Sequence, residues 1–541
     1  AKRRVKIGTS PLAANADVCV DPDRLFGRHL AVLGNTGSGK SCSVAGLIQW
    51  SLEAVKENQG NPNARFIILD PNGEYLKVFK DKGRVFQVNN QQNPLQVPLW
   101  FWNSSEWCSF TQASAKAQIP LLKKALRAMR NEQFEITDST SILIRKFIST
   151  IIISLKNDIS SGKPWGSFPN PKNFLNKVCK WLESVTSLSS RLRDDNNSLD
   201  ELIGILEEYR VNRCEKYPVY EGTIEEVENI QKEAIHVLKE FGGSEKDLLP
   251  KSEDIPVKFS GDVFVNYLEM LAQETGNEQY IEFLLARIHT MISDTNMKSI
   301  IGDDVDITLE EWLNMYIGSH RVEQGCVTVI DLSLVPTEII HITTAVIARM
   351  IFEALQRYRR LNGKPLPTVL VMEEAHTFIK RYKEDSDNYN ASSICCQVFE
   401  KIAREGRKFG LGLVLSSQRP SELSQTVLSQ CNSFLLHRIS NDRDQEIVSR
   451  LVPDNLRGLL KELPSLPSQQ AILLGWAAEL PIMVKMNDLS IEKRPHSDDP
   501  DYWDVWCRKD ILGNEVKREV DWKKIADDWQ ENINKTDKID T

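Results

Sequence analysis

Runs of apolar and β-branched residues bounded by turn signals occur in two separated blocks of the chain. The runs are His29–Gly34, Arg65–Asp70 and Arg84–Val88 in the first block, and Cys326–Leu332, Thr368–Met372, Leu411–Ser417 and Ser433–His437 in the second. Near-continuous hydrophobic strands of this kind are typical of a parallel sheet that is covered on both faces. Helical spacing of apolar residues in Ser41–Lys56 and Thr343–Arg360 supplies the covering helices. This alternation of strands and helices predicts a doubly wound α/β domain.

The interval between the two blocks, residues 105–320, has a different pattern. Apolar residues recur there at three- and four-residue spacing, and strand-like runs are scarce. Helices are expected at Ser139–Leu155, Asn173–Ser187, Leu199–Arg210, Ile224–Phe241 and Glu278–Ser293. The polar stretch Arg191–Ser198 is expected to be a loop. The pattern predicts a mainly helical insertion into the α/β domain.

The chain is therefore expected to have four parts. Residues 1–104 and 321–489 form the two parts of the α/β core, residues 105–320 the insertion, and residues 490–541 a C-terminal arm. The arm carries acidic clusters, prolines and four tryptophans, and two interpretations stay open: it docks on a neighbouring subunit, or it packs on its own domain. A strand-like segment follows Ala1 almost at once, and we expect a further N-terminal segment before it.

Length, charge and cysteine usage narrow the class of protein. A chain of 541 residues is too long for one compact core. A net charge of −8 argues against a binder of nucleic acid coated in basic residues, although basic groups inside a central channel remain compatible with it. No apolar run is long enough to span a bilayer and no signal segment opens the chain, so a cytoplasmic protein is expected. The ten cysteines lack metal-ligand spacing, and no structural zinc site is expected.

The strongest chemical signal is the motif GNTGSGKS, which fits G-x-x-x-x-G-K-[ST] in full between a hydrophobic strand and a helical stretch. Glycines let the backbone wrap around phosphate, and the helix start adds its positive dipole end. Lys40 is expected to reach the β- and γ-phosphates of ATP, and Ser41 to ligate Mg²⁺. The alternative is a glycine-rich turn before a buried helix. The expected nucleotide-binding residues are Gly34, Asn35, Thr36, Gly37, Ser38, Gly39, Lys40, Ser41 and Cys42.

A second candidate is the acidic pair that follows the strand Thr368–Met372. Strand side chains alternate in direction, so Glu373 and Glu374 can take different roles. Glu373 occupies the position of the acidic residue that a Walker B strand places near Mg²⁺. We expect it to contact the ion through a water molecule. Glu374 is expected to polarise the attacking water as the catalytic base. The alternative is a pair of acidic residues that end a strand at the surface.

Three further sites are less specific. Gln418 follows the strand Leu411–Ser417 and is a candidate γ-phosphate sensor or a strand-capping amide. Arg404 and Arg407 lie in a basic stretch with glycines, and either is a candidate arginine supplied to a neighbouring subunit or part of a solvated turn. Asp70 and Glu74 follow the end of a strand. They are candidates either for arranging magnesium or for forming the turn.

Taken together, these motifs resemble the HerA family of hexameric ATPases, relatives of the FtsK DNA translocases. The matching segments are RHLAVLGNTGSGKS, IILDPNGEY, VTVIDLS, VLVMEEAH, AREGRKFGLGLVLSSQRP and VLSQCNSFLLHRISNDRDQE, which cover roughly residues 25–105 and 325–490. The combination of the P-loop with EEAH and GRKFG…SQRP is specific, whereas the P-loop alone is not. Two features depart from the family: its N-terminal β-barrel has no counterpart in this sequence, and the helical insertion matches no segment that we can name.

The resemblance implies a RecA-like ATPase core assembled as a homo-hexamer, with ATP between subunits and double-stranded DNA through the pore. It also implies that Lys40 and Ser41 bind ATP–Mg²⁺, that Glu374 is catalytic, and that Arg404 or Arg407 acts in trans. Family members commonly work with a partner enzyme, either a nuclease or, in bacterial anti-phage systems, a sirtuin-like NADase.

Two functions follow as hypotheses. The first is an ATP-driven DNA translocase or helicase that works with a partner effector in anti-phage defence or DNA end processing. The basic residues in Thr377–Asn390 are candidates for its pore loop, or for a solvated surface loop. The second is an ATP-dependent oligomeric scaffold that assembles the effector without moving DNA. A small-molecule kinase is a weak third interpretation.

Overall fold

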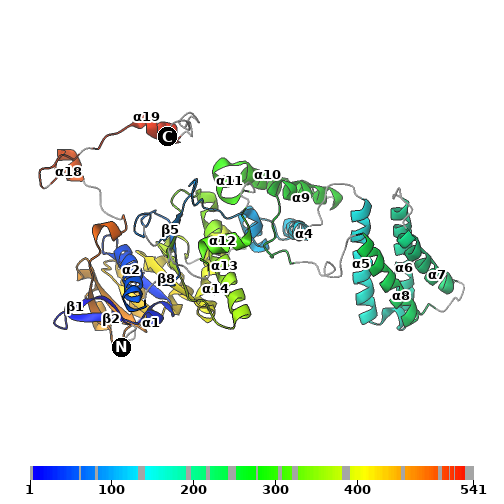
Figure 1. Ribbon diagram of the computed structural model, residues 1–541, viewed down its shortest axis with the longest axis horizontal. Helices are drawn as coiled ribbons and strands as arrows, with labels where there is room; N and C mark the ends of the chain where they lie inside the picture. The colour runs from blue at the N-terminus through cyan, green and yellow to red at the C-terminus, as the bar shows by residue number, and fades with distance from the viewer. Residues whose placement is uncertain are drawn as a thin grey trace.

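The computed structural model describes most of the chain, and all structural statements below refer to these residues. They are residues 4–59, 62–79, 83–131, 140–190, 197–214, 220–241, 252–275, 278–302, 307–319, 327–380, 390–451, 457–496, 502–510, 512–516 and 518–529. Their strands form one sheet in the order β2-β1-β11-β10-β9-β3-β8-β7-β4-β6-β5. Figure 1 shows this sheet at one end of the molecule, with helices on both sides and helical segments extending away from it.

Seven neighbouring strands of the sheet run parallel, and they are the seven runs expected from the sequence. They are β3 (Leu30–Leu33), β4 (Phe66–Asp70), β5 (Gly83–Phe86), β6 (Val327–Asp331), β7 (Thr368–Met372), β8 (Leu411–Ser417) and β9 (Ser433–Leu436). Strand β8 pairs with β3 on one side and with β7 on the other. Strand β8 therefore lies between the strand that precedes the P-loop and the strand that precedes the acidic pair. The predicted α/β, RecA-like fold class is confirmed.

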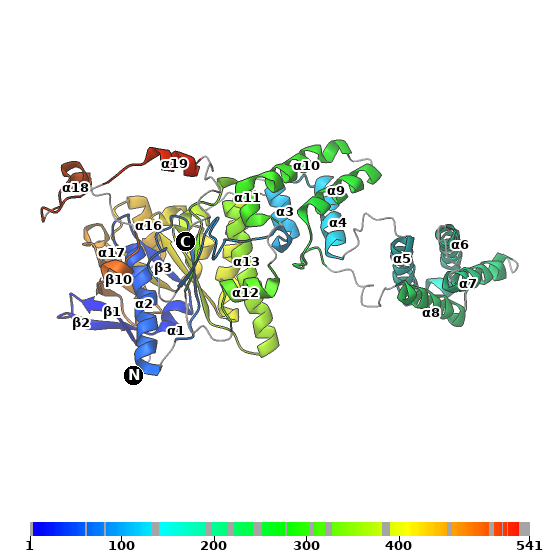
Figure 2. The ribbon, with the colours of Figure 1, turned by 45° about the horizontal axis from the view of Figure 1, so that its top comes forward.

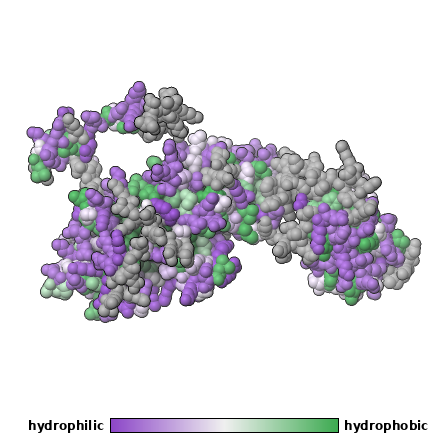
Figure 3. Space-filling model, viewed as in Figure 1, coloured by the Kyte–Doolittle hydropathy of each residue, from purple (hydrophilic) through white to green (hydrophobic). Residues whose placement is uncertain are grey.

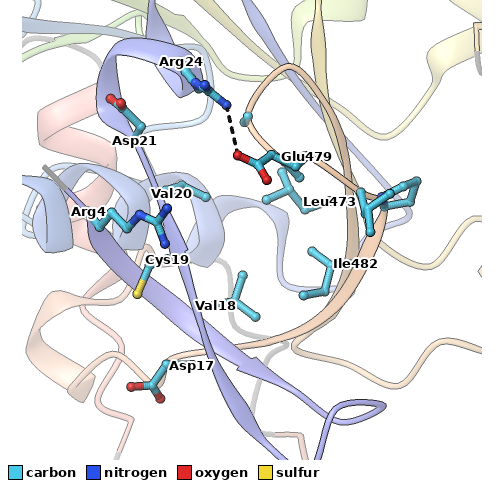
Figure 4. Close-up of a pocket in the computed structure, with 14 residues that line it drawn as sticks. Arg4, Asp17, Val18, Cys19, Val20, Asp21, Arg24, Leu473, Glu479 and Ile482 are labelled. Atoms are coloured by element: carbon cyan, nitrogen blue, oxygen red, sulfur yellow. Dashed lines mark ion pairs between the residues drawn. The ribbon is translucent and has the colours of Figure 1, made fainter. Parts of the chain in front are cut away.

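Four antiparallel strands extend the sheet beyond β9, and the sequence patterns indicated only the first of them. They are β1 (Val5–Ser10), β2 (Ala16–Val20), β10 (Gln470–Gly475) and β11 (Ile482–Met486). Strands β2 and β11 each bury only two of their five residues, so they lack the continuous apolar run by which the parallel strands were recognised. A pocket of about 620 Å³ lies between β2 and the β10–β11 hairpin (Figure 4).

Two hydrophobic layers cover the faces of the parallel strands. Leu30 and Val32 of β3 pack in the layer that contains helix α2 (Lys40–Gln59). The alternate residues of β3 pack in the other layer, with helices α13 (Thr337–Asn362) and α14 (Ala391–Glu405). Successive side chains of a strand point to opposite faces of the sheet. The alternation therefore fixes how the end of β3, and with it the start of the P-loop, is oriented between the two layers. The remaining helices near the sheet are α1 (Pro22–Phe26), α15 (Gln425–Gln430), α16 (Asp442–Leu451) and α17 (Arg457–Leu460).

Part of the expected helical insertion belongs to the core of the sheet domain. Its helices are α3 (Ser104–Thr111), α4 (Gln118–Arg130), α9 (Gly261–Thr275), α10 (Glu278–Ser293), α11 (Thr295–Ile301) and α12 (Leu309–Tyr316). Trp107, Phe264 and Trp312 from these helices lie in the same hydrophobic cluster as β3 and α13. A buried ion pair with a 2.6 Å distance joins Arg349 Nε of α13 to Glu106 Oε1 of α3. These helices are therefore fastened to the sheet domain.

The rest of the interval forms a separate four-helix bundle, which the sequence patterns did not distinguish. Its helices are α5 (Thr140–Ser160), α6 (Asn170–Ser189), α7 (Asn197–Cys214) and α8 (Ile224–Glu240). The four helices share a hydrophobic core of their own, and Figures 1 and 2 show the bundle standing apart from the sheet domain. The visible surface of the bundle is mostly hydrophilic, with a few apolar residues scattered over it (Figure 3). The expected loop Arg191–Ser198 lies mostly outside the described residues.

The C-terminal arm carries two short helices, α18 (Tyr502–Cys507) and α19 (Trp522–Trp529), which lie away from the sheet in Figures 1 and 2. The side chains of Trp503, Trp506 and Trp522 are each more than 70% exposed in the single chain, at 73%, 72% and 73%. Packing of these three side chains on their own domain, one of the two expected arrangements, is thus not what the structure shows. No helix among the described residues combines the length and apolar character that a membrane crossing requires.

Candidate nucleotide-binding site

The P-loop is the turn between the end of β3 at Leu33 and the start of α2 at Lys40. Gly34 has no room for a side chain, because an added Cβ would lie 2.5 Å from the Cβ of His437. Gly37 and Gly39 have φ angles of +69° and +98°, in the region that favours glycine. Each glycine of the motif is therefore required by close approach or by backbone conformation.

Neighbouring strands hold the P-loop in place from both sides. The Asn35 amide donates to the Arg438 carbonyl beyond β9 at 2.8 Å, and the Gly34 amide donates to the Ser417 carbonyl at the end of β8 at 3.2 Å. The Thr36 hydroxyl donates to Oε1 of Gln418, the predicted sensor. The loop is thus connected directly to the strand that separates it from the acidic pair.

The P-loop lysine lies inside the loop. Lys40 is only 5% exposed, and its Nζ donates to the Asn35 carbonyl at 2.9 Å. Burial lowers the pKa of Lys40, and Glu374, Glu373 and Glu74 oppose this shift by their negative charges. The negative charges of the three carboxylates therefore favour the protonated form of Lys40, the group expected to bind phosphate. The sequence-predicted residues Lys40, Glu373 and Glu374 are brought together at one edge of the sheet.

Glu373 directly follows β7 and points into the interior. It is 4% exposed, and the Tyr75 hydroxyl donates to its Oε1. Burial raises the pKa of Glu373 to about 7, although hydrogen bonds from Ser416 and Tyr75 work in the opposite direction. The Tyr75 hydroxyl also lies 3.2 Å from the carbonyl oxygen of Ser41. Tyr75 therefore joins the acidic position to the first turn of α2.

Glu374 has a different environment and a strained backbone. Its φ and ψ are 42° and 47°, a left-handed conformation that non-glycine residues seldom adopt. Its side chain is 18% exposed, and Nδ1 of His376 lies 3.1 Å from its Oε2. The two adjacent acids thus separate into a buried one and a partly accessible one.

The turn after β4 is organised by Asp70. Its carboxylate is fully buried and accepts hydrogen bonds from the amides of Tyr75 at 2.8 Å and Asn72 at 3.3 Å. Burial raises the pKa of Asp70 to about 6, against these hydrogen bonds. Asp70 thus performs the turn-forming role, one of the two alternatives for this residue, and it places Tyr75. The negative charge of Glu74 raises the pKa of Lys40 and that of Glu373.

The two candidate arginines lie away from the P-loop of their own chain. Arg404 is exposed near the end of α14, 3.9 Å from Glu400, and Arg407 is exposed in the short turn Gly406–Phe409. Both precede β8, whereas the P-loop lies beyond its far end. At ~3.3 Å per residue, a seven-residue strand separates the two edges of the sheet by roughly 20 Å. Neither arginine serves the nucleotide site of its own chain in this structure, so a role in trans stays a prediction.

The residues at the acidic edge fit a magnesium ion bound through phosphate and water. Mg²⁺ takes oxygen ligands and usually keeps several waters beside one or two protein groups and substrate phosphates. The Ser41 hydroxyl at the start of α2 and the buried Glu373 carboxylate supply such oxygens. No group of three or more His, Cys, Asp or Glu residues in the described part of the chain is arranged to hold a metal by itself. This composition agrees with a metal that arrives with ATP.

Three residues at this edge were not among those predicted from sequence. Tyr75 contacts Glu373, His376 contacts Glu374, and the fully buried His437 packs behind Gly34. Burial lowers the pKa of His437 to about 4, and the charge of Lys40 adds to this shift. All three follow a strand of the parallel sheet within a few residues. The rule that ligands bind at the carboxyl ends of such strands would have found them.

Comparisons with known proteins agree with these features. The family model described as "Helicase HerA, central domain" matches residues 5–248. The chain is 24% identical over 482 residues to "Probable helicase MJECL08" of Methanocaldococcus jannaschii, covering 89% of this chain and 70% of that protein. It is 23% identical over 497 residues to "DNA double-strand break repair helicase HerA" of Pyrococcus furiosus, covering 89% and 69% respectively.

Among solved structures, the plasmid coupling protein TrwB in complex with ADP and Mg²⁺ is 15% identical, with a TM-score of 0.40, and the match covers 91% of this chain and 97% of that one. The sequence relatives span most of both α/β blocks, where the P-loop and the acidic pair lie. The site and the sequence relatives identify this chain as a P-loop ATPase, and its sequence is similar to those of HerA-type helicases.

Proposed function

We propose that this protein is an ATP-driven translocase of double-stranded DNA that works as a homo-hexamer. The observation that carries the proposal is the placement of Lys40 and Glu374 on opposite sides of β8, with Gln418, which follows that strand, hydrogen-bonded to the P-loop. On this proposal, Lys40 binds phosphate, Glu374 activates water and Gln418 senses the γ-phosphate at one edge of the sheet. The names of the relatives in Pyrococcus furiosus and Methanocaldococcus jannaschii support DNA as the substrate.

The proposal is tested by the response of ATP turnover to duplex DNA. We expect linear double-stranded DNA to raise the steady-state rate of phosphate release severalfold at low salt. The stimulation should fall steeply as salt rises, because contacts with DNA phosphates release counterions. A rate that is the same with and without duplex at every salt concentration would contradict the translocase proposal and leave the ATPase assignment intact.

The trans role of the arginines is a separate prediction. Arg404→Ala and Arg407→Ala should each be examined alone, because the structure places both at the edge of the sheet opposite the P-loop. For the arginine that acts in trans, we expect kcat to fall by about 10³-fold or more, the size of effect known for arginine fingers. Mixing that variant with Lys40→Ala subunits should restore part of the activity, since each supplies what the other lacks. Absence of any rescue in mixed rings would exclude action across the interface.

A partner effector enzyme, either a nuclease or a sirtuin-like NADase, is the second part of the proposal, with a role in anti-phage defence or DNA end processing. The α5–α8 bundle favours a scaffold as the alternative function. It has its own core and stands apart from the ATPase domain, so it offers a docking surface that DNA movement does not require.

Of the candidate pore residues, Lys380 is exposed, whereas Arg381 and Lys383 lie outside the described residues.

A further inference from the structure

His376 connects the candidate catalytic base to the strand that contacts the P-loop. Its Nδ1 lies 3.1 Å from Glu374 Oε2 and 3.3 Å from the Ser417 hydroxyl. Both side chains of the acid–imidazole pair are mostly buried, with exposures of 18% for Glu374 and 12% for His376. Within the described residues, Glu374 Oε2 is buried and has no aligned hydrogen-bond partner. His376 Nδ1 lies within hydrogen-bond distance of that oxygen but is not aligned with it.

The far side of this contact leads to the phosphate-binding loop. The Ser417 carbonyl accepts from the Gly34 amide at 3.2 Å, and the next residue, Gln418, accepts from the Thr36 hydroxyl. The Ser417 hydroxyl also accepts from the Arg419 amide at 3.1 Å, which holds it in place. The Ser417 side chain therefore links the end of β8, which contacts the P-loop, to His376.

We propose that His376 is a positioning residue that orients the Glu374 carboxylate and couples its orientation to the P-loop through Ser417. This inference rests on the proposed role of Glu374 as the base. A carboxylate oxygen only accepts hydrogen bonds, so the contact with Glu374 requires a hydrogen on Nδ1. The left-handed backbone at Glu374 needs such a support, because a strained residue persists only where its surroundings hold it. Catalytic hydrogen bonds are often long or poorly aligned before the substrate is in place.

The chemistry of the amide side chains gives a matched test. The amide nitrogen of Asn occupies the position of Nδ1 of His, whereas that of Gln occupies the position of Nε2. Misplacing a catalytic group by about 1 Å can cost roughly 10²-fold in rate. We therefore expect His376→Ala and His376→Gln to lower kcat by roughly 10- to 100-fold, with little change in KM for ATP. His376→Asn should recover most of the lost rate, and His289→Asn, on the exposed side of α10, serves as the matched control.

A double-variant comparison separates positioning of Glu374 from other roles. If His376 acts through Glu374, His376→Ala should have no further effect on hydrolysis in a Glu374→Gln background, because residues that act as a unit are non-additive. ATP retention and the melting temperature of each variant should match those of its parent. A full additive loss in the double variant, or equal rates for the Asn and Gln variants, would overturn the inference.

The same experiment distinguishes this inference from the proposed function. Near-normal turnover by Glu374→Gln would remove the base assignment itself. Loss of turnover in Glu374→Gln together with wild-type turnover in His376→Ala would leave the function standing and remove only the role of His376.

Discussion

Replacement of Glu374 by Gln is expected to slow ATP hydrolysis about 10²- to 10⁴-fold, the usual contribution of a general base. The substitution keeps the size of the side chain and removes its ability to accept a proton. ATP should remain bound, because the P-loop contacts are unchanged and one negative charge near the phosphates is removed. Lys40 is one of the groups on which that charge acts. Phosphate release under saturating ATP and retention of labelled ATP on filters measure the two effects separately.

A suitable control for this variant is Glu422→Gln, which changes a partly exposed glutamate after the end of β8 that is paired with Arg419. It should hydrolyse ATP at the wild-type rate. Turnover of Glu374→Gln within a few-fold of wild type would show that another group activates the water. Loss of ATP binding in Glu374→Gln would instead indicate that the residue holds the nucleotide or the fold.

Lys40→Ala is expected to weaken ATP binding roughly 10- to 100-fold, since a hydrogen bond to a charged group contributes about 1.5–3 kcal/mol. Hydrolysis should fall further, because the lysine charge also stabilises the developing charge on the γ-phosphate. Lys40 is 5% exposed and lies among three acidic residues, so its removal also leaves their mutual repulsion without a counter-charge. Equilibrium binding of a fluorescent ATP analogue with Mg²⁺ measures the first effect directly.

Lys56→Ala, near the other end of the same helix, is the matched control for this prediction and should bind ATP normally. The Lys40 variant also separates the two proposed functions. A translocase should keep its partner and lose activity in an intact complex, whereas an ATP-dependent scaffold should fail to assemble the complex. Unchanged ATP affinity in Lys40→Ala would place the nucleotide site elsewhere in the chain.

The parts of the fold that were predictable share one physical property. Six of the seven parallel strands are buried on both faces, so each appears in the sequence as a nearly continuous apolar run, whereas the edge strand β5 buries only Phe86. Strands β2 and β11 have one exposed face and short alternating patterns, which a turn or loop also produces. The separation of the α5–α8 bundle from α9 and α10 was not predictable, because helical periodicity shows that a helix has a buried face without showing which partner covers it.

The candidate site also has a part that was predictable from the sequence and a part that was not. The P-loop and the acidic pair are short local motifs whose chemistry follows from residues close together in sequence. Tyr75 and His376 matter through contacts with residues 298 and 41 positions away, Glu373 and Ser417 respectively. Such contacts depend on the strand order, in which β8 and β7 lie between β3 and β4. The arginines are a different case, because their expected role is in trans and a single chain shows only that they lie at the edge of the sheet opposite its own P-loop.

An experimental structure of the Glu374→Gln protein with ATP and Mg²⁺ tests the central claim most directly. We predict the triphosphate in the loop Gly34–Ser41, with Lys40 at the β- and γ-phosphates, Mg²⁺ on the Ser41 hydroxyl, and residue 374 facing the γ-phosphate. A triphosphate bound outside this loop, or a γ-phosphate beyond the reach of residue 374, would contradict it.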